Sequence, residues 1–238
     1  MNRLLGLIYP PKCPYCSAAL KFDMTECLVC RAKFPETPRI EPLVTGEICV
    51  APFTYNTVIK KAIAQYKFRG KKFNTHSFAS ALAGSIKNVY SKDMSFELIT
   101  CVPMSPDRKK KRGYNQAELV AKMTADILGK KFVQVLYRDS GAKEQHLKSY
   151  ENRIKDEDNT FHIIAPELVR GKNILLIDDV MTTGTTLSRC SSILKENGAE
   201  RVFCGAIAIV KGYSFGNSKR YIDAAEKQSS GKGNENGT

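Results

Sequence analysis

An aliphatic run that ends in two acids and a threonine-rich bend leaves this chain few possible folds. Residues 174–177 are all aliphatic, and the acids Asp178 and Asp179 follow directly. Such a run is typical of a strand buried on both faces, as in a parallel sheet covered by helices. Loops at the carboxyl ends of these strands bind ligands. We therefore expect a ligand site directly after this strand.

The bend has the composition of an anion site. Its hydroxyl donors are Thr182, Thr183, Thr185 and Thr186. Loop N–H groups and the amino end of the following helix would point outward together and bind phosphate, and Gly184 lacks the Cβ that would keep an anion from the backbone. Carboxylates beside an anion are favourable only if they accept hydroxyl hydrogen bonds or hold a cation. A ribose phosphate meets both conditions, with ring hydroxyls at Asp178 and Asp179 and Mg²⁺ nearby.

Other interpretations of the bend explain less. The Walker A pattern G-x-x-x-x-G-K-[ST] does not occur in the chain, which argues against a P-loop nucleotidase. An ordinary helix cap would need one such residue rather than the whole run. The histidines His76, His146 and His162 have no partner identifiable in the sequence, and we expect no Ser/His/Asp or Cys/His catalytic group.

Strand-like and helical patterns alternate around this segment, which predicts βα units in a mostly parallel α/β sheet flanked by helices. We expect strands at 48–55, 96–102, 132–137, 174–177 and 201–210, and helices at 58–66, 74–90, 115–128 and 185–196. The polar stretch 140–159 is a loop or a short helix. The sheet domain is expected over 43–212, followed by a disordered polar tail over 213–238.

Four of the eight cysteines form two C-x-x-C pairs, Cys13 with Cys16 and Cys27 with Cys30. Two such pairs about ten residues apart can hold one tetrahedral zinc ion. Four thiolate ligands leave no open coordination position, so the zinc would be structural rather than catalytic. A redox dithiol is the alternative.

Prolines at 35, 38 and 42 interrupt regular structure. We expect a zinc-ribbon module and linker over 1–42. The other cysteines are expected to be buried and without chemistry: Cys49, Cys101, Cys190 and Cys204.

The charge balance favours polyanionic partners. Lys and Arg number 37 against 24 Asp and Glu, a net charge of +13. Such a partner would be a nucleic acid or a multiply phosphorylated small molecule. Charge alone does not distinguish a binding surface for these partners from a basic surface that is merely solvated.

No apolar run approaches the roughly 20 residues of a membrane span, and the run at 4–9 is too short for an export signal. We expect a cytoplasmic protein.

Two segments resemble a known family. Residues 176–186 resemble the signature of type I phosphoribosyltransferases. Residues 102–105 and 108–116 are similar to segments of its ComF branch, the competence-associated proteins in which a cysteine zinc module precedes the domain. The resemblance covers residues 10 to 212. Lys148 and Asp156 depart from the branch's pattern, and a second zinc site found in many relatives is missing.

The resemblance implies roles for particular residues. Phosphoribosyl transfer needs no protein nucleophile, because catalysis is positioning and stabilisation of the departing pyrophosphate. The implied catalytic residues are Asp178, Asp179 and Arg112. Besides the bend, the implied phosphoribosyl-binding residues are Pro103, Met104, Ser105 and Lys67. Residues 108–112 are expected to form a mobile loop over the pyrophosphate, with a solvated basic turn as the alternative.

Two basic groups are candidates for nucleic-acid binding. One is Lys109, Lys110 and Lys111. The other is Arg69, Lys71 and Lys72, which lie beside Phe68 and Phe73. Cations interleaved with aromatic rings hold single strands by phosphate contacts and base stacking. The second group fits the far wall of the sugar-phosphate pocket equally well.

Two functions of different classes follow. The first is a protein that binds phosphoribosyl diphosphate and Mg²⁺ and acts in DNA uptake through single-stranded DNA, with a competence helicase or other uptake proteins as partners implied by the resemblance. The alternative is a genuine phosphoribosyltransferase, a glycosyltransferase of nucleotide salvage or synthesis, with no DNA role.

Overall fold

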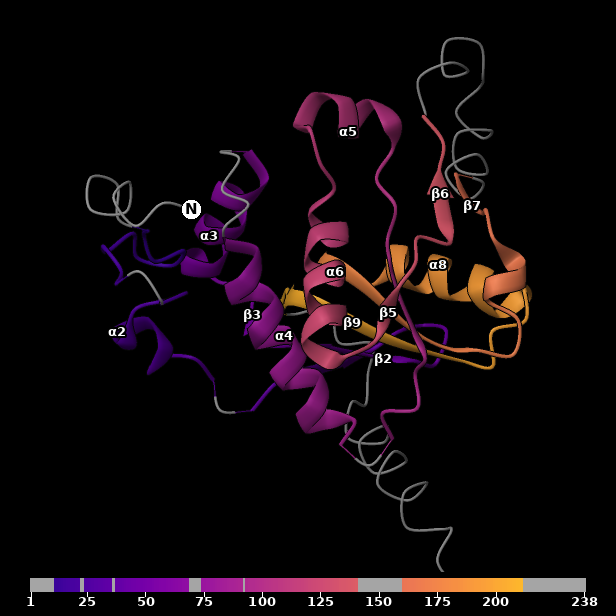
Figure 1. The fold of residues 1–238 in the computed structure, drawn as a ribbon, viewed down its shortest axis with the longest axis horizontal. Coiled ribbons are helices and arrows are strands. Elements are labelled where there is room, and N and C mark those ends of the chain that lie inside the picture. The colour runs from indigo at the N-terminus through magenta and orange to yellow at the C-terminus, as the bar shows by residue number, and fades with distance from the viewer. Residues whose placement is uncertain are drawn as a thin grey trace, which may run out of the picture.

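Strands and helices alternate along the chain (Figure 1). The computed structural model describes residues 11–21, 24–35, 37–68, 74–91, 93–140 and 160–211. The strands are β1 (Arg39–Pro42), β2 (Ile48–Ala51), β3 (Phe53–Thr54), β4 (Leu98–Cys101), β5 (Lys131–Phe132), β6 (Leu136–Arg138), β7 (Phe161–Ile163), β8 (Asn173–Met181) and β9 (Arg201–Ile209). The helices are α2 (Leu28–Arg31), α3 (Thr57–Phe68), α4 (Thr75–Val89), α5 (Pro106–Arg112), α6 (Gln116–Leu128) and α8 (Thr185–Glu196), with a 3₁₀ turn η3 (Pro166–Leu168).

The main sheet has seven strands in the order β1-β2-β9-β8-β4-β5, and β3 also pairs with β9. Strands β1 and β2 run antiparallel. The other pairings in this sheet are parallel. Strand β8 lies in the middle, and its residues 174–177 are fully buried. The predicted fold class, a mostly parallel sheet flanked by helices, is therefore confirmed.

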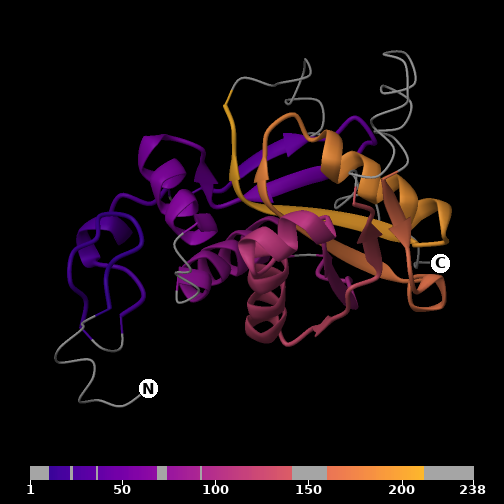
Figure 2. The same cartoon turned by 90° about the horizontal axis from the view of Figure 1, so that it is seen from above.

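Helices cover both faces of the sheet. Helices α4 and α6 pack together over one face, and α8 lies over the other (Figure 2). Each interface is filled by its own apolar core. The core under α4 and α6 includes Phe78, Ile99 and Ile177. The core under α8 includes Leu176 and Leu194.

The four-cysteine segment, residues 11–35, packs onto the core under α4. Cys13, Tyr15 and Leu20 belong to that core. The Tyr15 ring lies 5.9 Å from the Phe78 ring of α4 and 5.7 Å from the Phe53 ring of β3, edge to face in both contacts. Such aromatic contacts each add about 1 kcal/mol beyond burial. The segment and the sheet domain thus share one core.

Several predicted boundaries differ from the structure for identifiable reasons. Pro52 divides the predicted strand 48–55 into β2 and β3, because proline cannot donate to the ladder. The predicted strand 132–137 is divided into β5 and β6, and β6 pairs with β7 in a separate ribbon. The linker prediction was wrong at residues 39–42, which form the edge strand β1. Pro42 is tolerated there because it ends an edge strand.

The stretch 140–159, except for residue 140, and the predicted tail over 213–238 lie outside the described residues. In the part of the chain that the structure describes, no helix combines the length and apolar character needed to cross a bilayer.

Candidate functional site

Two loops open at the same edge of the sheet. Strands β4 and β8 are parallel neighbours, with Cys101 opposite Ile177. The Val102 N–H continues the ladder by donating to the Ile177 carbonyl at 2.9 Å. The turn after β4, residues 102–105, therefore begins beside the strand that carries Asp178 and Asp179. This is the edge at which the sequence predicts a ligand site.

The two acids belong to β8 rather than to a loop after it. The strand continues to Met181, and Asp178 lies opposite Ala206 of β9. Both acids are half-buried, and the Asp179 N–H donates to Asp178 Oδ1 at 2.7 Å. The longer strand holds the carboxylates on regular backbone at the rim of the sheet.

The carboxylates of Asp178 and Asp179 have different neighbours. Burial, followed by the charge of Asp178, raises the pKa of the Cys190 thiol on α8. Burial, with smaller contributions from Tyr114 and Asp179, raises the pKa of Tyr66 on α3. Adjacent strand residues point to opposite faces. Leu176 belongs to the core under α8 and Ile177 to the core under α4 and α6, so Asp178 continues the α8 face and Asp179 the other face.

The threonine bend, residues 182–186, leads from β8 into α8. Thr182, Thr183 and Thr185 are exposed. The hydroxyls of Thr183 and Thr185 are 2.9 Å apart, and the Thr185 N–H donates to Thr183 Oγ1. No acidic residue lies in the first turn of α8, so the partial positive charge of the helix end is not neutralised there. Exposed donors and a positive helix end together favour an anion.

Gly184 is constrained by packing as well as by its backbone conformation. A Cβ on Gly184 would lie 2.8 Å from Leu43 Cδ2 and 3.0 Å from Met181 Cε, and its φ is +79°. The space that the glycine leaves is therefore taken by apolar side chains on the inner side of the bend. Its missing Cβ accommodates the core, and its contact with an anion stays a prediction.

The 102–105 turn is tied to helix α6. Asn115 Nδ2 donates to the Val102 carbonyl at 3.0 Å, and Asn115 Oδ1 accepts from the Ala117 N–H at 3.1 Å as the cap of α6. Pro103 and Ser105 are buried, and Met104 is half-buried. The asparagine thus holds the turn and starts the helix at the same time.

Residues 106–112 form helix α5 instead of the expected loop. Pro106 begins the helix, and Gly113 ends it with a φ of +85°. Arg108 and the candidate nucleic-acid residues Lys109, Lys110 and Lys111 are exposed. Helix α5 stands beyond the amino end of α6 (Figure 1). Arg112 Nη1 donates to Gln116 Oε1 at 2.8 Å, and Lys109 pairs with Glu118 at 3.3 Å.

The remaining candidate residues lie at the end of α3 or directly after it. Lys67 lies on the last turn of α3. Arg69, Lys71 and Lys72 are outside the described residues.

A hydrogen-bonded group that sequence reasoning missed joins α3, α4 and α6. Tyr66 Oη donates to the Gln116 carbonyl and accepts from Thr75 Oγ1, both at 3.2 Å, and Tyr114 Oη donates to the Tyr66 carbonyl. Among the described residues, buried Gln116 Nε2 and both amide atoms of Asn74 lack a hydrogen-bond partner. The available signal was the Tyr114-Asn115-Gln116 run directly at the start of α6.

The four N-terminal thiols meet the geometric requirement for a metal. All four sulfur atoms lie within 4.8 Å of one another, and those of Cys16 and Cys27 are 3.6 Å apart. A tetrahedron with zinc–sulfur bonds of about 2.3 Å has edges of about 3.8 Å. The Cys30 N–H, with smaller contributions from the other thiols, lowers the pKa of the Cys27 thiol to about 7, whereas burial raises the pKa of the Cys30 thiol. The spacing of the four sulfur atoms therefore fits a metal ion.

The other four cysteines are free and buried, as predicted. Two histidines do have neighbours: His162 Nε2 lies 2.6 Å from Asp139 Oδ2, and His76 Nδ1 lies 3.3 Å from Ser80 Oγ. The His162 pair joins β7 to the end of β6 and is exposed, so it is an ordinary surface pair. His146 lies outside the described residues.

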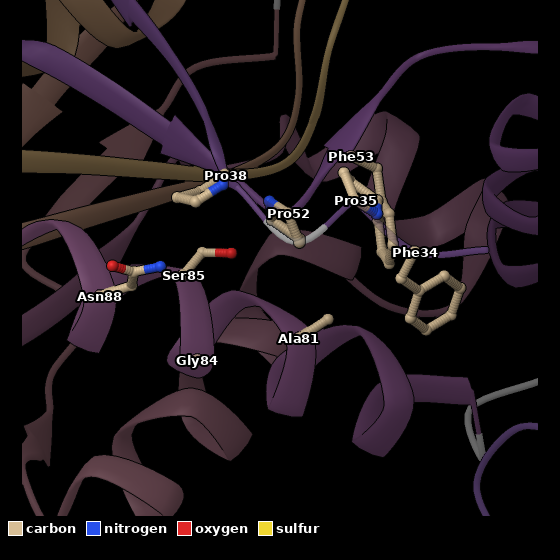
Figure 3. Close-up of a pocket in the computed structure, with 9 residues that line it drawn as sticks. All are labelled: Phe34, Pro35, Pro38, Pro52, Phe53, Ala81, Gly84, Ser85 and Asn88. Carbon is tan, nitrogen blue, oxygen red and sulfur yellow. The ribbon is translucent and has the colours of Figure 1, made fainter. Parts of the chain in front are cut away.

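A pocket lies between the end of the four-cysteine segment and α4 (Figure 3). Phe34, Pro38 and Phe53 face Ser85 and Asn88 across it. None of its lining residues is titratable. The lining consists of apolar and neutral polar side chains, so the pocket has no acid, base or nucleophile of the usual catalytic kinds apart from the Ser85 hydroxyl.

Comparison with known proteins gives a family match and several relatives. The family model described as phosphoribosyl transferase domain matches residues 91–220. That span includes the 102–105 turn, both acids and the threonine bend.

The relatives carry two kinds of name. The "Competence protein ComFC" of Streptococcus pneumoniae is 34% identical over 153 residues, 64% of each chain. The protein of the same name from Bacillus subtilis is 32% identical over 146 residues, 61% of this chain and 57% of that protein. The "DNA utilization protein YhgH" of Salmonella typhimurium is 26% identical over 194 residues, 80% of each chain. The alignments span less than two thirds of both ComFC proteins, and the resemblance to the ComF branch is confirmed.

Proposed function

Because the chain belongs to the phosphoribosyl transferase domain family, we propose that it binds phosphoribosyl diphosphate with Mg²⁺ at the carboxyl edge of its sheet. The observation that carries the proposal is the meeting of two loops there. The 102–105 turn and the threonine bend follow neighbouring parallel strands. One ligand with a phosphate at each end can therefore contact both.

The threonine bend is assigned the 5-phosphate. Its exposed hydroxyls and the N–H groups at the start of α8 are the donors, and the packed inner side of the bend keeps them turned outward. The 102–105 turn is assigned the pyrophosphate. Asn115 fixes this turn through the Val102 carbonyl.

The acids are assigned the ribose hydroxyls between these ends. Asp178 and Asp179 are fixed on β8, so their carboxylates need no reorganisation to accept hydrogen bonds. Carboxylate oxygens are also ligands that Mg²⁺ prefers, and the ion would neutralise charge on the pyrophosphate. The cations of α5 stand over the same edge and would contribute to that neutralisation.

Isothermal titration with phosphoribosyl diphosphate and Mg²⁺ tests this proposal. We expect saturable binding by the full chain and a loss of at least tenfold in affinity in Asp178→Asn/Asp179→Asn. The matched control is Asp126→Asn, an exposed acid on α6. Absence of binding at millimolar ligand by folded protein contradicts the proposal.

A role in DNA uptake through single-stranded DNA is proposed for the whole protein. It is supported by the names of the relatives, competence and DNA utilization proteins, and by the exposed cations of α5. The alternative is an enzyme of nucleotide salvage or synthesis. Only that alternative requires release of pyrophosphate on addition of a free base.

Salt dependence tests the DNA role. Binding of an oligonucleotide should weaken with salt by about 0.7 log units per log unit for each neutralised phosphate. Replacing Arg108, Lys110 and Lys111 by alanine should lower that slope by about 2. The control replaces Lys87, Lys131 and Lys172, exposed lysines at the opposite edge. Equal effects of the two triple variants, or binding insensitive to salt, would reject α5 as the DNA contact.

A further inference from the structure

We propose that the turn between β1 and β2, residues 43–47, is part of the phosphate-binding apparatus. Leu43 is a positioning residue that supports the threonine bend from its inner side, and Glu47 is a positioning residue that fixes the turn to α8. The inference rests on the proposed function in that the bend is taken to hold the 5-phosphate. Nothing in the family match, which begins at residue 91, covers this turn.

Leu43 lies directly against the bend. It is 4% exposed, and its Cδ2 would be 2.8 Å from a Cβ on Gly184. Met181 Cε fills the neighbouring space at 3.0 Å. Both side chains belong to the core under α8. The inner side of the bend is therefore packed, and the exposed threonines lie on the chain around it.

The turn has a shape of its own. The Leu43 N–H donates to the Glu47 carbonyl at 2.7 Å, and the Gly46 N–H donates to the Leu43 carbonyl at 3.1 Å. Gly46 adopts a φ of +93°, which glycine permits without strain. Thr45 Oγ1 donates to the Glu47 carboxylate. These bonds hold Leu43 at a defined position ahead of β2.

Glu47 connects this turn to the helix that starts at the bend. Its side chain is 5% exposed and pairs with Lys195. Its Oε1 also accepts from Ser191 Oγ at 2.8 Å, and Lys195 Nζ donates to the Thr45 carbonyl at 3.3 Å. Ser191 and Lys195 are one helical turn apart on α8. These contacts fix the β1–β2 turn to α8, which keeps Leu43 against Gly184.

The consequence is a bend whose donors are arranged before the ligand arrives. Ligands bind more tightly to groups that need no ordering on binding. Loss of the Leu43 side chain should free the bend without affecting the 102–105 turn, which is held separately by Asn115.

Amide hydrogen exchange of the ligand-free full chain tests the inference. In Leu43→Ala, we expect exchange in 183–188 to be at least tenfold faster and exchange at 102–105 to be unchanged. The matched control is Leu98→Ala, which removes the same side-chain atoms from the same core, but at the amino end of β4. In this variant, amide exchange in 183–188 should match that of the parent protein. Leu43→Met should retain slow exchange. Glu47→Gln should give an intermediate increase.

Ligand titrations provide the second readout. Leu43→Ala should lose at least tenfold in affinity for ribose 5-phosphate and less than twofold for pyrophosphate. Unchanged exchange in 183–188, or equal acceleration in Leu98→Ala, would overturn the inference, as would equal loss of both ligands. The proposed function fails if the parent protein does not bind phosphoribosyl diphosphate with Mg²⁺, and the exchange comparison then still decides the role of Leu43. If Leu43→Ala does not fold, Leu43→Val is measured by the same two criteria.

Discussion

At the residue scale, Gly184 is constrained by its backbone and by its neighbours together. Its φ of +79° is one that side chains rarely adopt, and Leu43 occupies the space where a Cβ would stand. The sequence indicates that a glycine is needed there, but it does not reveal the neighbour, because Leu43 is 141 residues away in the chain. Local patterns identify the bend; only the folded sheet supplies what lies beneath it.

Gly184→Ala should therefore destabilise the protein by about 2 kcal/mol, of which about 1 kcal/mol is backbone strain and the rest is the contact with Leu43. Urea unfolding measures the change. Gly171→Ala is the matched control, because Gly171 has a φ of +68° and open space around its Cβ position; it should lose only the backbone part. Combining Gly184→Ala with Leu43→Ala should cost less than the sum of the two single changes. An additive result would mean that the contact is unimportant.

At the scale of elements, the sequence predicts some pieces well and misses others for physical reasons. Helix α8 is found at its predicted bounds because Asn197-Gly198 gives a clear stop. Helix α5 was missed although Pro106 and Gly113 mark its ends, because a run of exposed cations has no apolar face. Strand β1 was missed because edge strands need little hydrophobic pattern.

The element formed by β1, β2 and their turn carries a testable pH dependence. Burial of Glu47 opposes ionisation, but the hydrogen bonds from Lys195, Thr45 and Ser191 outweigh it, so its pKa is lowered from 4.5. A carboxyl whose pKa is lower in the folded state stabilises the protein above about pH 4.5, and this stabilisation is lost as the pH falls through the folded pKa.

Glu47→Gln should accordingly lower the free energy of unfolding by about 2 kcal/mol at pH 7. The difference between variant and parent should shrink as the pH falls below 4.5. Urea unfolding at several pH values measures it. Glu196→Gln, an exposed acid at the end of α8, is the control and should change little at any pH. A difference independent of pH would show that the Glu47 charge does not contribute.

At the scale of the whole molecule, the four-cysteine segment is part of the main core. The C-x-x-C spacing predicts the thiol cluster correctly, since the ligands lie close together in the chain. It does not predict the contact of Tyr15 with Phe78, which joins residues 63 positions apart. The segment therefore depends on the sheet domain for its apolar partners, and the sheet domain depends on the segment to cover Phe53 and Phe78.

If the four thiols hold a zinc ion, its removal should lower the stability of the entire chain. We expect one zinc ion per chain by elemental analysis. A strong chelator, or Cys16→Ser, should lower Tm by at least 5 °C, corresponding to the loss of about 2 kcal/mol or more. Because the chain has no tryptophan, unfolding is followed by tyrosine circular dichroism. Ser17→Ala is the control beside Cys16. Two separate transitions, or an unchanged Tm, would contradict a shared core.

Helix α4 is attached at its first turns to both halves of the molecule. Ser77 Oγ lies 3.0 Å from the hydroxyl of Tyr15 and donates to Glu26 at 2.9 Å, both in the four-cysteine segment. Thr75, two residues earlier, bonds to Tyr66, which bonds in turn to the start of α6 beside Asn115. Within three residues, the amino end of α4 therefore bonds to the four-cysteine segment on one side and, through Tyr66, to the start of α6 on the other, so one helix end holds two parts of the chain that lie far apart in sequence.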